Sequence, residues 1–132
     1  MTLLRVETGD LLAELRRLEA GLKGLLSREG DPSEMEVWRV YAGTEKVIAK
    51  LKARLGFETP GASFELPKAP SDPRRLLEDA KAKLSDGAAA LSRGEHAEAV
   101  GLLRGARNLL RGYLTERRRA ATRALRKSPK PS

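Results

Sequence analysis

Leucine residues in the first part of the chain recur with the period of one helical face. From Leu11 the steps to Leu15, Leu18, Leu22 and Leu25 alternate between four and three residues, and charged residues fill half of the positions between them. This pattern is typical of an amphipathic helix, here over about residues 10–27. A self-associating coiled coil needs more heptads than this, so we expect the helix to pack within its own chain.

A second helix is predicted over about residues 32–55. Its apolar face repeats at the same period and comprises Val37, Tyr41, Thr44, Ile48, Leu51 and Leu55. The segment is preceded by a helix-start signal in which Asp31 can cap, Pro32 suits the first helical position and Glu34 lies where a capping box places its acid. Gly56 follows the last apolar position, as is typical of a helix end.

Two further helices are predicted to form a tight hairpin. Asp72-Pro73 begins a helix over about residues 73–93, and its stripe alternates large and small residues up to Gly94. The next amphipathic segment, about residues 95–126, follows after almost no loop. Two helices joined in this way must lie side by side in opposite directions.

The segment between the two helix pairs, residues 57–71, contains three prolines and a glycine and cannot be helical. It also contains Phe57, Phe64 and Leu66, which are too apolar for a free linker. Structureless loops of this length are uncommon in compact domains, so we expect an ordered crossover held to the bundle by its aromatic residues. The alternative is a hinge between two helical hairpins.

The four segments together predict an all-α protein. We expect a single domain over residues 1–132, built as an antiparallel four-helix bundle with a long basic C-terminal helix and a short tail at 127–132. The 132 residues are sufficient for one core. The pattern leaves open whether the first and second helix pairs share that core.

The charge of the chain is concentrated at its C-terminal end. Residues 101–132 contain ten Lys and Arg and one acid, Glu116, so they carry +9, whereas residues 1–100 sum to −1. The apolar arc of the last helix ends after Leu114, and we expect the helix to leave the core near residue 116 and to continue as a basic projection. The candidate nucleic-acid-binding residues are Arg104, Arg107, Arg111, Arg117, Arg118, Arg119, Arg123, Arg126 and Lys127.

A third strip of the last helix is made of small residues. Gly101, Gly105 and Gly112 lie on it, and each interior glycine costs a helix roughly 1 kcal/mol relative to alanine. Such a cost is consistent with the close approach of another backbone. The strip therefore faces either a neighbouring helix of the same chain or a protein partner, and these three glycines are the candidate partner-binding residues.

The hairpin resembles a single tetratricopeptide repeat over residues 84–107. The matching positions are Gly87, Ala90, Gly94, Ala99, Leu103 and Ala106. The chain departs from the family pattern at Ala90, where a large residue is usual, and at Arg111, which replaces the closing proline. No second copy is present, so the resemblance implies one helical hairpin and no repeat array.

The turn from Gly94 to Ala99 is also similar to the helical hairpin of the HEPN family, some of whose members are ribonucleases. Those enzymes carry an Arg and a His four to six residues later on one helix. The single His of this chain is His96, and the nearest upstream Arg, Arg93, is three residues before it across the glycine turn. The resemblance therefore implies a shape and no activity.

The composition excludes most catalytic classes. There is no Cys and one His, which removes disulfides, thiolate nucleophiles and metal clusters built on these residues. Neither the phosphate-loop nor the dinucleotide glycine pattern occurs. We therefore expect a protein that is not an enzyme and has no catalytic residue, metal, cofactor or small-molecule substrate. The scarcity of Asn and Gln beside 33% charged residues is typical of a thermophilic source, although a GC-biased genome gives a similar composition.

No apolar run is long enough to span a membrane, and the N-terminus lacks the order of a signal peptide, so we expect a cytoplasmic protein without membrane association. Trp38 lies one position off the apolar stripe of its helix. It is either the edge of the core or an exposed stacking surface for a base or a partner side chain.

The sequence leaves two functions open. The first is a non-enzymatic module whose basic helix binds nucleic acid or a ribonucleoprotein through phosphate charge, without sequence specificity. The second is a protein–protein adaptor that uses the hairpin as a helix-binding or homodimer surface.

Overall fold

The computed structural model describes residues 8–56 and 72–127. Within these residues the chain forms four helices and no strand, so the prediction of an all-α fold is confirmed. The helices are α1 (Gly9–Leu26), α2 (Glu34–Leu55), α3 (Pro73–Ser92) and α4 (His96–Lys127). The expected crossover at 57–71 lies outside the described residues, as do residues 128–132 of the tail expected at 127–132, whereas Lys127 belongs to α4.

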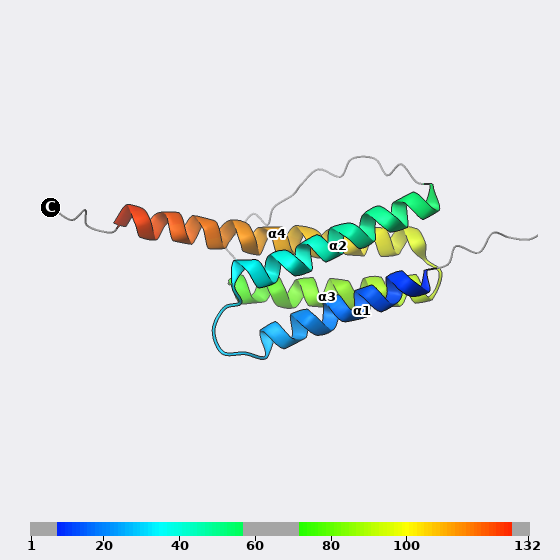
Figure 1. The fold of residues 1–132 in the computed structure, drawn as a ribbon, viewed down its shortest axis with the longest axis horizontal. Helices are drawn as coiled ribbons and strands as arrows, with labels where there is room; N and C mark the ends of the chain where they lie inside the picture. The colour runs from blue at the N-terminus through cyan, green and yellow to red at the C-terminus, as the bar shows by residue number, and fades with distance from the viewer. Residues whose placement is uncertain (1–7, 57–71, 128–132) are drawn as a thin grey trace, which may run out of the picture.

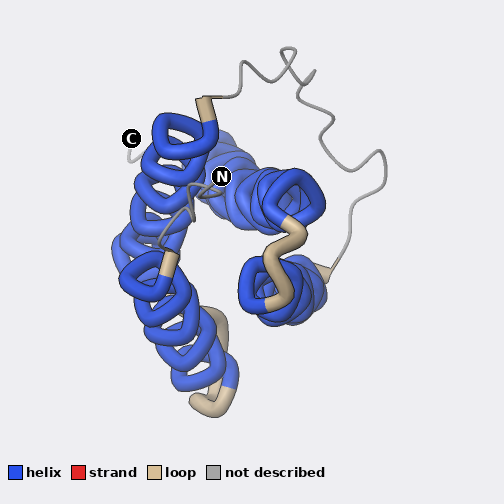
Figure 2. Tube along the Cα trace, turned by 90° about the vertical axis from the view of Figure 1, so that its right-hand side faces the viewer, coloured by secondary structure: helices blue, strands red, loops and turns tan. Residues whose placement is uncertain are grey.

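Each helix packs against two others. The contacting pairs are α1 with α2, α1 with α3, α2 with α4 and α3 with α4, so α1 and α4 lie diagonally across the bundle, as do α2 and α3 (Figure 2). The colour gradient in Figure 1 shows α1 and α4 running from right to left and α2 and α3 from left to right. The last turns of α4 extend past the ends of the other helices.

One hydrophobic core joins all four helices. The fully buried side chains include leucines from each of them: Leu15 and Leu22 from α1, Leu51 from α2, Leu77 and Leu84 from α3, and Leu103 and Leu110 from α4. The first and second helix pairs therefore share a core. The sequence pattern had left this question open.

The start of α2 differs from the prediction. The N-cap is Ser33, whose hydroxyl accepts the Glu36 N–H at 3.3 Å and donates to the Glu36 carboxylate at 3.1 Å. The capping box is thus Ser33 with Glu36, and the prediction of an Asp31 cap with Glu34 as its acid is wrong. The physical reason is that Pro32 is buried and its carbonyl accepts a tertiary hydrogen bond, which holds this residue in the loop ahead of the helix.

The start of α3 follows the Asp-Pro signal. The Asp72 carboxylate accepts the Arg74 N–H at 3.1 Å, and Pro73 occupies the first helical position. Gly56 and Gly94, at the ends of α2 and α3, have φ values of 69° and 78°, which is the left-handed conformation that favours glycine. In the parts of the chain that the structure describes, no helix is both long and apolar enough to cross a membrane.

Candidate nucleic-acid interface on the last helix

The 32 residues of α4 divide into a packed part and a projecting segment. On the packed part, the arc that includes Ala99, Leu103, Leu110 and Tyr113 is buried in the core, and Tyr113 is the last buried side chain. Residues 118–126 are all exposed. We call residues 118–127 the projecting segment. It has no core contact because alanines and arginines occupy the positions where the leucine arc would continue.

Tyr113 helps to set the point at which α4 leaves the bundle. Its hydroxyl donates a hydrogen bond to the Pro32 carbonyl in the loop between α1 and α2, and burial raises the pKa of the Tyr113 phenol. One turn later the guanidinium of Arg117 lies 3.9 Å from the Asp31 carboxylate in the same loop. These contacts hold the end of the packed part, and the helix beyond them has no neighbouring helix.

The candidate arginines of the packed part belong to the bundle surface. The Arg107 side chain is only 13% exposed, and its guanidinium lies 3.1 Å from the Glu45 carboxylate of α2. Its guanidinium nitrogens also donate to the Asn108 side-chain oxygen. Arg104 is half-buried, whereas Arg111 is exposed. Arg107 therefore serves the α2–α4 contact and is poorly placed to meet a phosphate.

The arginines of the projecting segment have a different environment. Arg118, Arg119, Arg123 and Arg126 are exposed. Arg119 lies 3.2 Å from Glu116, while no ion pair of Arg118, Arg123 or Arg126 occurs among the described residues. At about 100° per residue, Arg119, Arg123 and Arg126 fall within an arc of roughly 60°. The segment thus presents a positive face in which Arg119 pairs with Glu116 and no acid among the described residues pairs with Arg123 or Arg126.

The three candidate glycines do not share one open face. Gly101 is exposed, and a Cβ atom added there would meet nothing within 4 Å. At Gly105 it would lie 3.4 Å from a carbon of the Lys83 side chain, and Gly112 is buried. The close approaches in this bundle occur instead at Gly87, against Leu103 of α4, and at Gly43, against Leu18 of α1.

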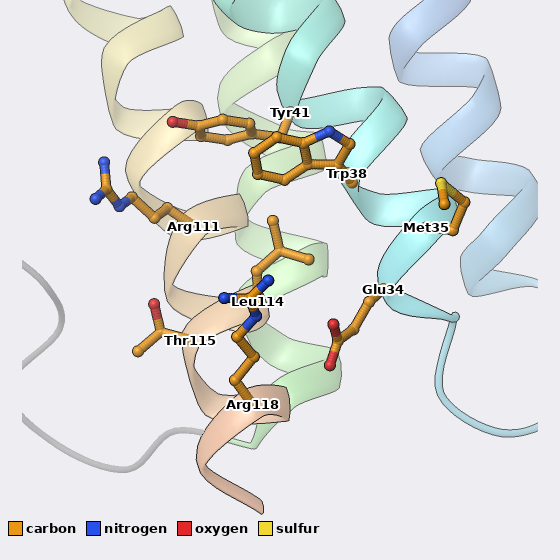
Figure 3. Close-up of a pocket in the computed structure, with 8 residues that line it drawn as sticks. All are labelled: Glu34, Met35, Trp38, Tyr41, Arg111, Leu114, Thr115 and Arg118. Atoms are coloured by element: carbon orange, nitrogen blue, oxygen red, sulfur yellow. The ribbon is translucent and has the colours of Figure 1, made fainter. Parts of the chain in front are cut away.

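A groove of about 580 Å³ lies between the first half of α2 and the end of the packed part of α4 (Figure 3). Trp38 is 54% exposed and stacks on Tyr41 with ring centroids 5.1 Å apart and an interplanar angle of 28°. The residue is therefore an exposed aromatic surface and not a buried core edge. The residues that line the groove are Glu34, Met35, Trp38, Tyr41, Arg111, Leu114, Thr115 and Arg118.

The sequence pattern did not assemble this groove. Met35, Leu114 and Thr115 were not among the candidate residues, because Leu114 belongs to the apolar arc of the last helix and the other two lie outside the predicted apolar faces. The available signal was the pair Met35 and Trp38, two large apolar residues three positions apart on α2 and outside its buried face. That spacing places both on one side of a helix.

The N-terminal end of α4, around His96, has few side chains suited to catalysis. His96 is the first residue of the helix and is half-exposed. Beside it, hydrogen bonding between Glu95 and Glu98 lowers the pKa of Glu95 and raises the pKa of Glu98, and the Arg93 guanidinium lies 3.1 Å from Glu95. Among residues 8–56 and 72–127 there is no cluster of three or more side chains that could hold a metal ion.

Comparison with known proteins adds no assignment. No protein-family model matches the chain, and no match was found among curated proteins or among solved structures. The function has to be inferred from the geometry and the charge of this molecule.

Proposed function

We propose that this protein is a non-enzymatic, cytoplasmic binding module whose basic C-terminal helix docks on nucleic acid or a ribonucleoprotein through phosphate contacts. The bundle serves as a rigid base for the projecting segment. The chain directions in Figure 1, with every contacting helix pair running in opposite directions, support an antiparallel four-helix frame for this role.

The observation that carries the proposal is the exposure of the projecting segment together with its charge. Residues 117–132 contain seven Arg and Lys and no Asp or Glu. Four of these cations, Arg118, Arg119, Arg123 and Arg126, are exposed on helical turns that have left the core. Arginine presents a planar fork that fits phosphate, and a row of such groups releases counterions when it meets a polyanion.

The alternative that α4 is simply a solvated charged helix accounts for the packed part, where Arg107 lies against an acid of α2. It does not account for a projecting segment without any acid. The adaptor alternative receives less support, because Gly105 faces Lys83 and Gly112 is buried, so the small residues provide no continuous open strip.

The test is binding of generic RNA and duplex DNA to a variant with Arg118→Gln, Arg123→Gln and Arg126→Gln. These side chains are exposed, so the variant should keep the stability of the intact protein while its affinity for both nucleic acids falls at least tenfold. The matched control carries Lys23→Gln, Lys46→Gln and Lys50→Gln, three exposed cations of α1 and α2. It loses the same charge and should bind within about threefold of the intact protein.

Equal losses in the two variants would show that net charge alone governs binding, and would reject a docking role for the projecting segment. The absence of binding by the intact protein at low salt would reject the proposal as a whole. In that case a search for a protein partner of the hairpin becomes the next experiment.

A further inference from the structure

The groove between α2 and α4 combines an aromatic wall with a basic wall. Trp38 and Tyr41 form the aromatic wall from α2, and Met35, 63% exposed, lies beside them. Arg111 and Arg118 extend from α4 on the opposite side, with Leu114 between them (Figure 3). Arg118 is also the first residue of the projecting segment, so the groove opens where that segment begins.

We propose that this groove binds an unpaired base of a single-stranded nucleic acid, with the base stacked on Trp38 and the adjoining phosphate at Arg118. The inference rests on the proposed function and narrows its partner from any polyanion to a strand with exposed bases. A duplex keeps its bases stacked and paired, so only an unpaired base can reach an aromatic side chain.

Exposure and charge together favour this occupant. When a flat partner covers a half-exposed aromatic side chain, apolar surface is removed from water, which favours binding. Every nucleobase has a flat aromatic face that can cover the ring in this way. The two arginines add charge that complements the phosphate next to the base. A nucleic-acid backbone that leaves the groove at Arg118 can continue toward the exposed Arg123 and Arg126 on the following turns of α4.

Among the described residues that line the groove, Glu34 is the only acid. It extends toward the same space as Arg118 in Figure 3. Its carboxylate opposes a phosphate bound there, whereas it would attract a cationic ligand such as an arginine-rich peptide. Glu34→Gln therefore separates the two classes of ligand, because it strengthens the binding of a nucleic acid and weakens the binding of a cation.

The direct test uses the fluorescence of Trp38, which is the single Trp of the chain. The intact protein is titrated with a short single-stranded RNA of mixed sequence and with a blunt duplex of the same sequence, while anisotropy of the labelled RNA reports binding. The expected result is saturable quenching by the single strand, and binding of the duplex without quenching.

Two variants at one position provide the matched control. Trp38→Phe keeps an aromatic face and should retain single-strand affinity within about threefold, whereas Trp38→Leu keeps an apolar side chain and should lose roughly 5- to 100-fold. Neither should alter duplex affinity. Circular dichroism and thermal unfolding check that both variants fold, as an exposed site predicts. Glu34→Gln should raise single-strand affinity.

The outcomes separate this inference from the proposed function. Binding of the single strand without a change in Trp38 fluorescence, or equal affinity of the Phe and Leu variants, overturns the groove assignment and leaves docking through the projecting segment intact. Weaker single-strand binding by Glu34→Gln would mean that no phosphate lies against that carboxylate, and it overturns the groove assignment. Failure of both RNAs to bind at low salt overturns the groove assignment and the proposed function together.

Discussion

The packed part and the projecting segment of α4 both contain arginine, but the surroundings of these arginines differ. In the packed part, Arg107 is 13% exposed and lies 3.1 Å from Glu45. In the projecting segment, Arg123 and Arg126 are exposed on turns that no other helix contacts, and no acid follows Glu116 in the chain. The charge of α4 therefore has two environments: Glu45 of α2 compensates Arg107 where the helix packs, whereas no acid among the described residues pairs with Arg123 or Arg126 where the helix projects.

The largest expected difference between the two parts concerns their leucines. Leu110 is fully buried and Leu125 is 76% exposed. Leu110→Ala should lower the free energy of unfolding by about 2–5 kcal/mol because it opens a cavity in the core. Leu125→Ala should change it by less than about 0.5 kcal/mol. Urea unfolding followed by circular dichroism measures both, and a comparable loss at Leu125 would mean that the projecting segment packs against the bundle.

Replacing glycine by alanine should lower the stability of the protein at one position and raise it at another. At Gly87 a new Cβ would lie 2.9 Å from the buried side chain of Leu103, so Gly87→Ala should destabilise the protein by about 1–2 kcal/mol. At Gly101 the added atom meets open space, so Gly101→Ala should stabilise the helix by about 0.5–1 kcal/mol. Thermal unfolding distinguishes the two. If Gly101→Ala lowered the stability instead, a neighbouring group would have to lie so close to Gly101 that only glycine fits there.

Tyr113→Phe tests the contact between the packed part and the loop before α2. The change removes a hydroxyl and leaves the Pro32 carbonyl without this donor, and we expect a loss of about 1–2 kcal/mol in the free energy of unfolding. The phenylalanine fills nearly the same volume, so packing is preserved. Urea unfolding measures the effect, and an unchanged stability would show that the hydrogen bond to Pro32 does not hold the end of the packed part.

Single arginine replacements give the smallest but most selective effects. Arg107→Gln removes a largely buried partner of Glu45 and should cost about 1 kcal/mol of stability with little effect on RNA affinity. Arg123→Gln should leave stability unchanged and weaken RNA binding by a few-fold. Unfolding experiments measure the stability of both variants, and RNA anisotropy measures their affinity. A loss of affinity at Arg107 larger than that at Arg123 would contradict the division of α4.

Local features of the fold followed from local sequence signals. The leucine spacing predicted the amphipathic helices, and the Asp-Pro pair at residue 72 marked the start of α3. The start of α2 was misjudged, because Asp31, Ser33 and Glu34 all have capping chemistry and the choice depends on Pro32, whose carbonyl is held by Tyr113 81 positions away in sequence. A local pattern has no access to such a contact.

The candidate site was predicted less completely, for the same reason. The positive charge of α4 and its projection beyond residue 116 were predicted, but the pairing of Arg107 with Glu45 was not, because it depends on how α2 and α4 align. The groove likewise requires Trp38 and Arg118 to meet across two helices. The apolar periodicity shows which residues share one face of a helix, but it does not specify which residues of another helix they contact.

The most direct test of the account is the salt dependence of RNA affinity, measured for the intact protein and for a version that ends at Glu116. A plot of log affinity against log salt should have a slope of about −3 to −4 for the intact protein with single-stranded RNA, as expected for roughly five phosphate contacts, and the shortened version should lose most of that slope together with its affinity. An unchanged slope in the shortened version would place the phosphate contacts elsewhere and contradict the role given to the projecting segment.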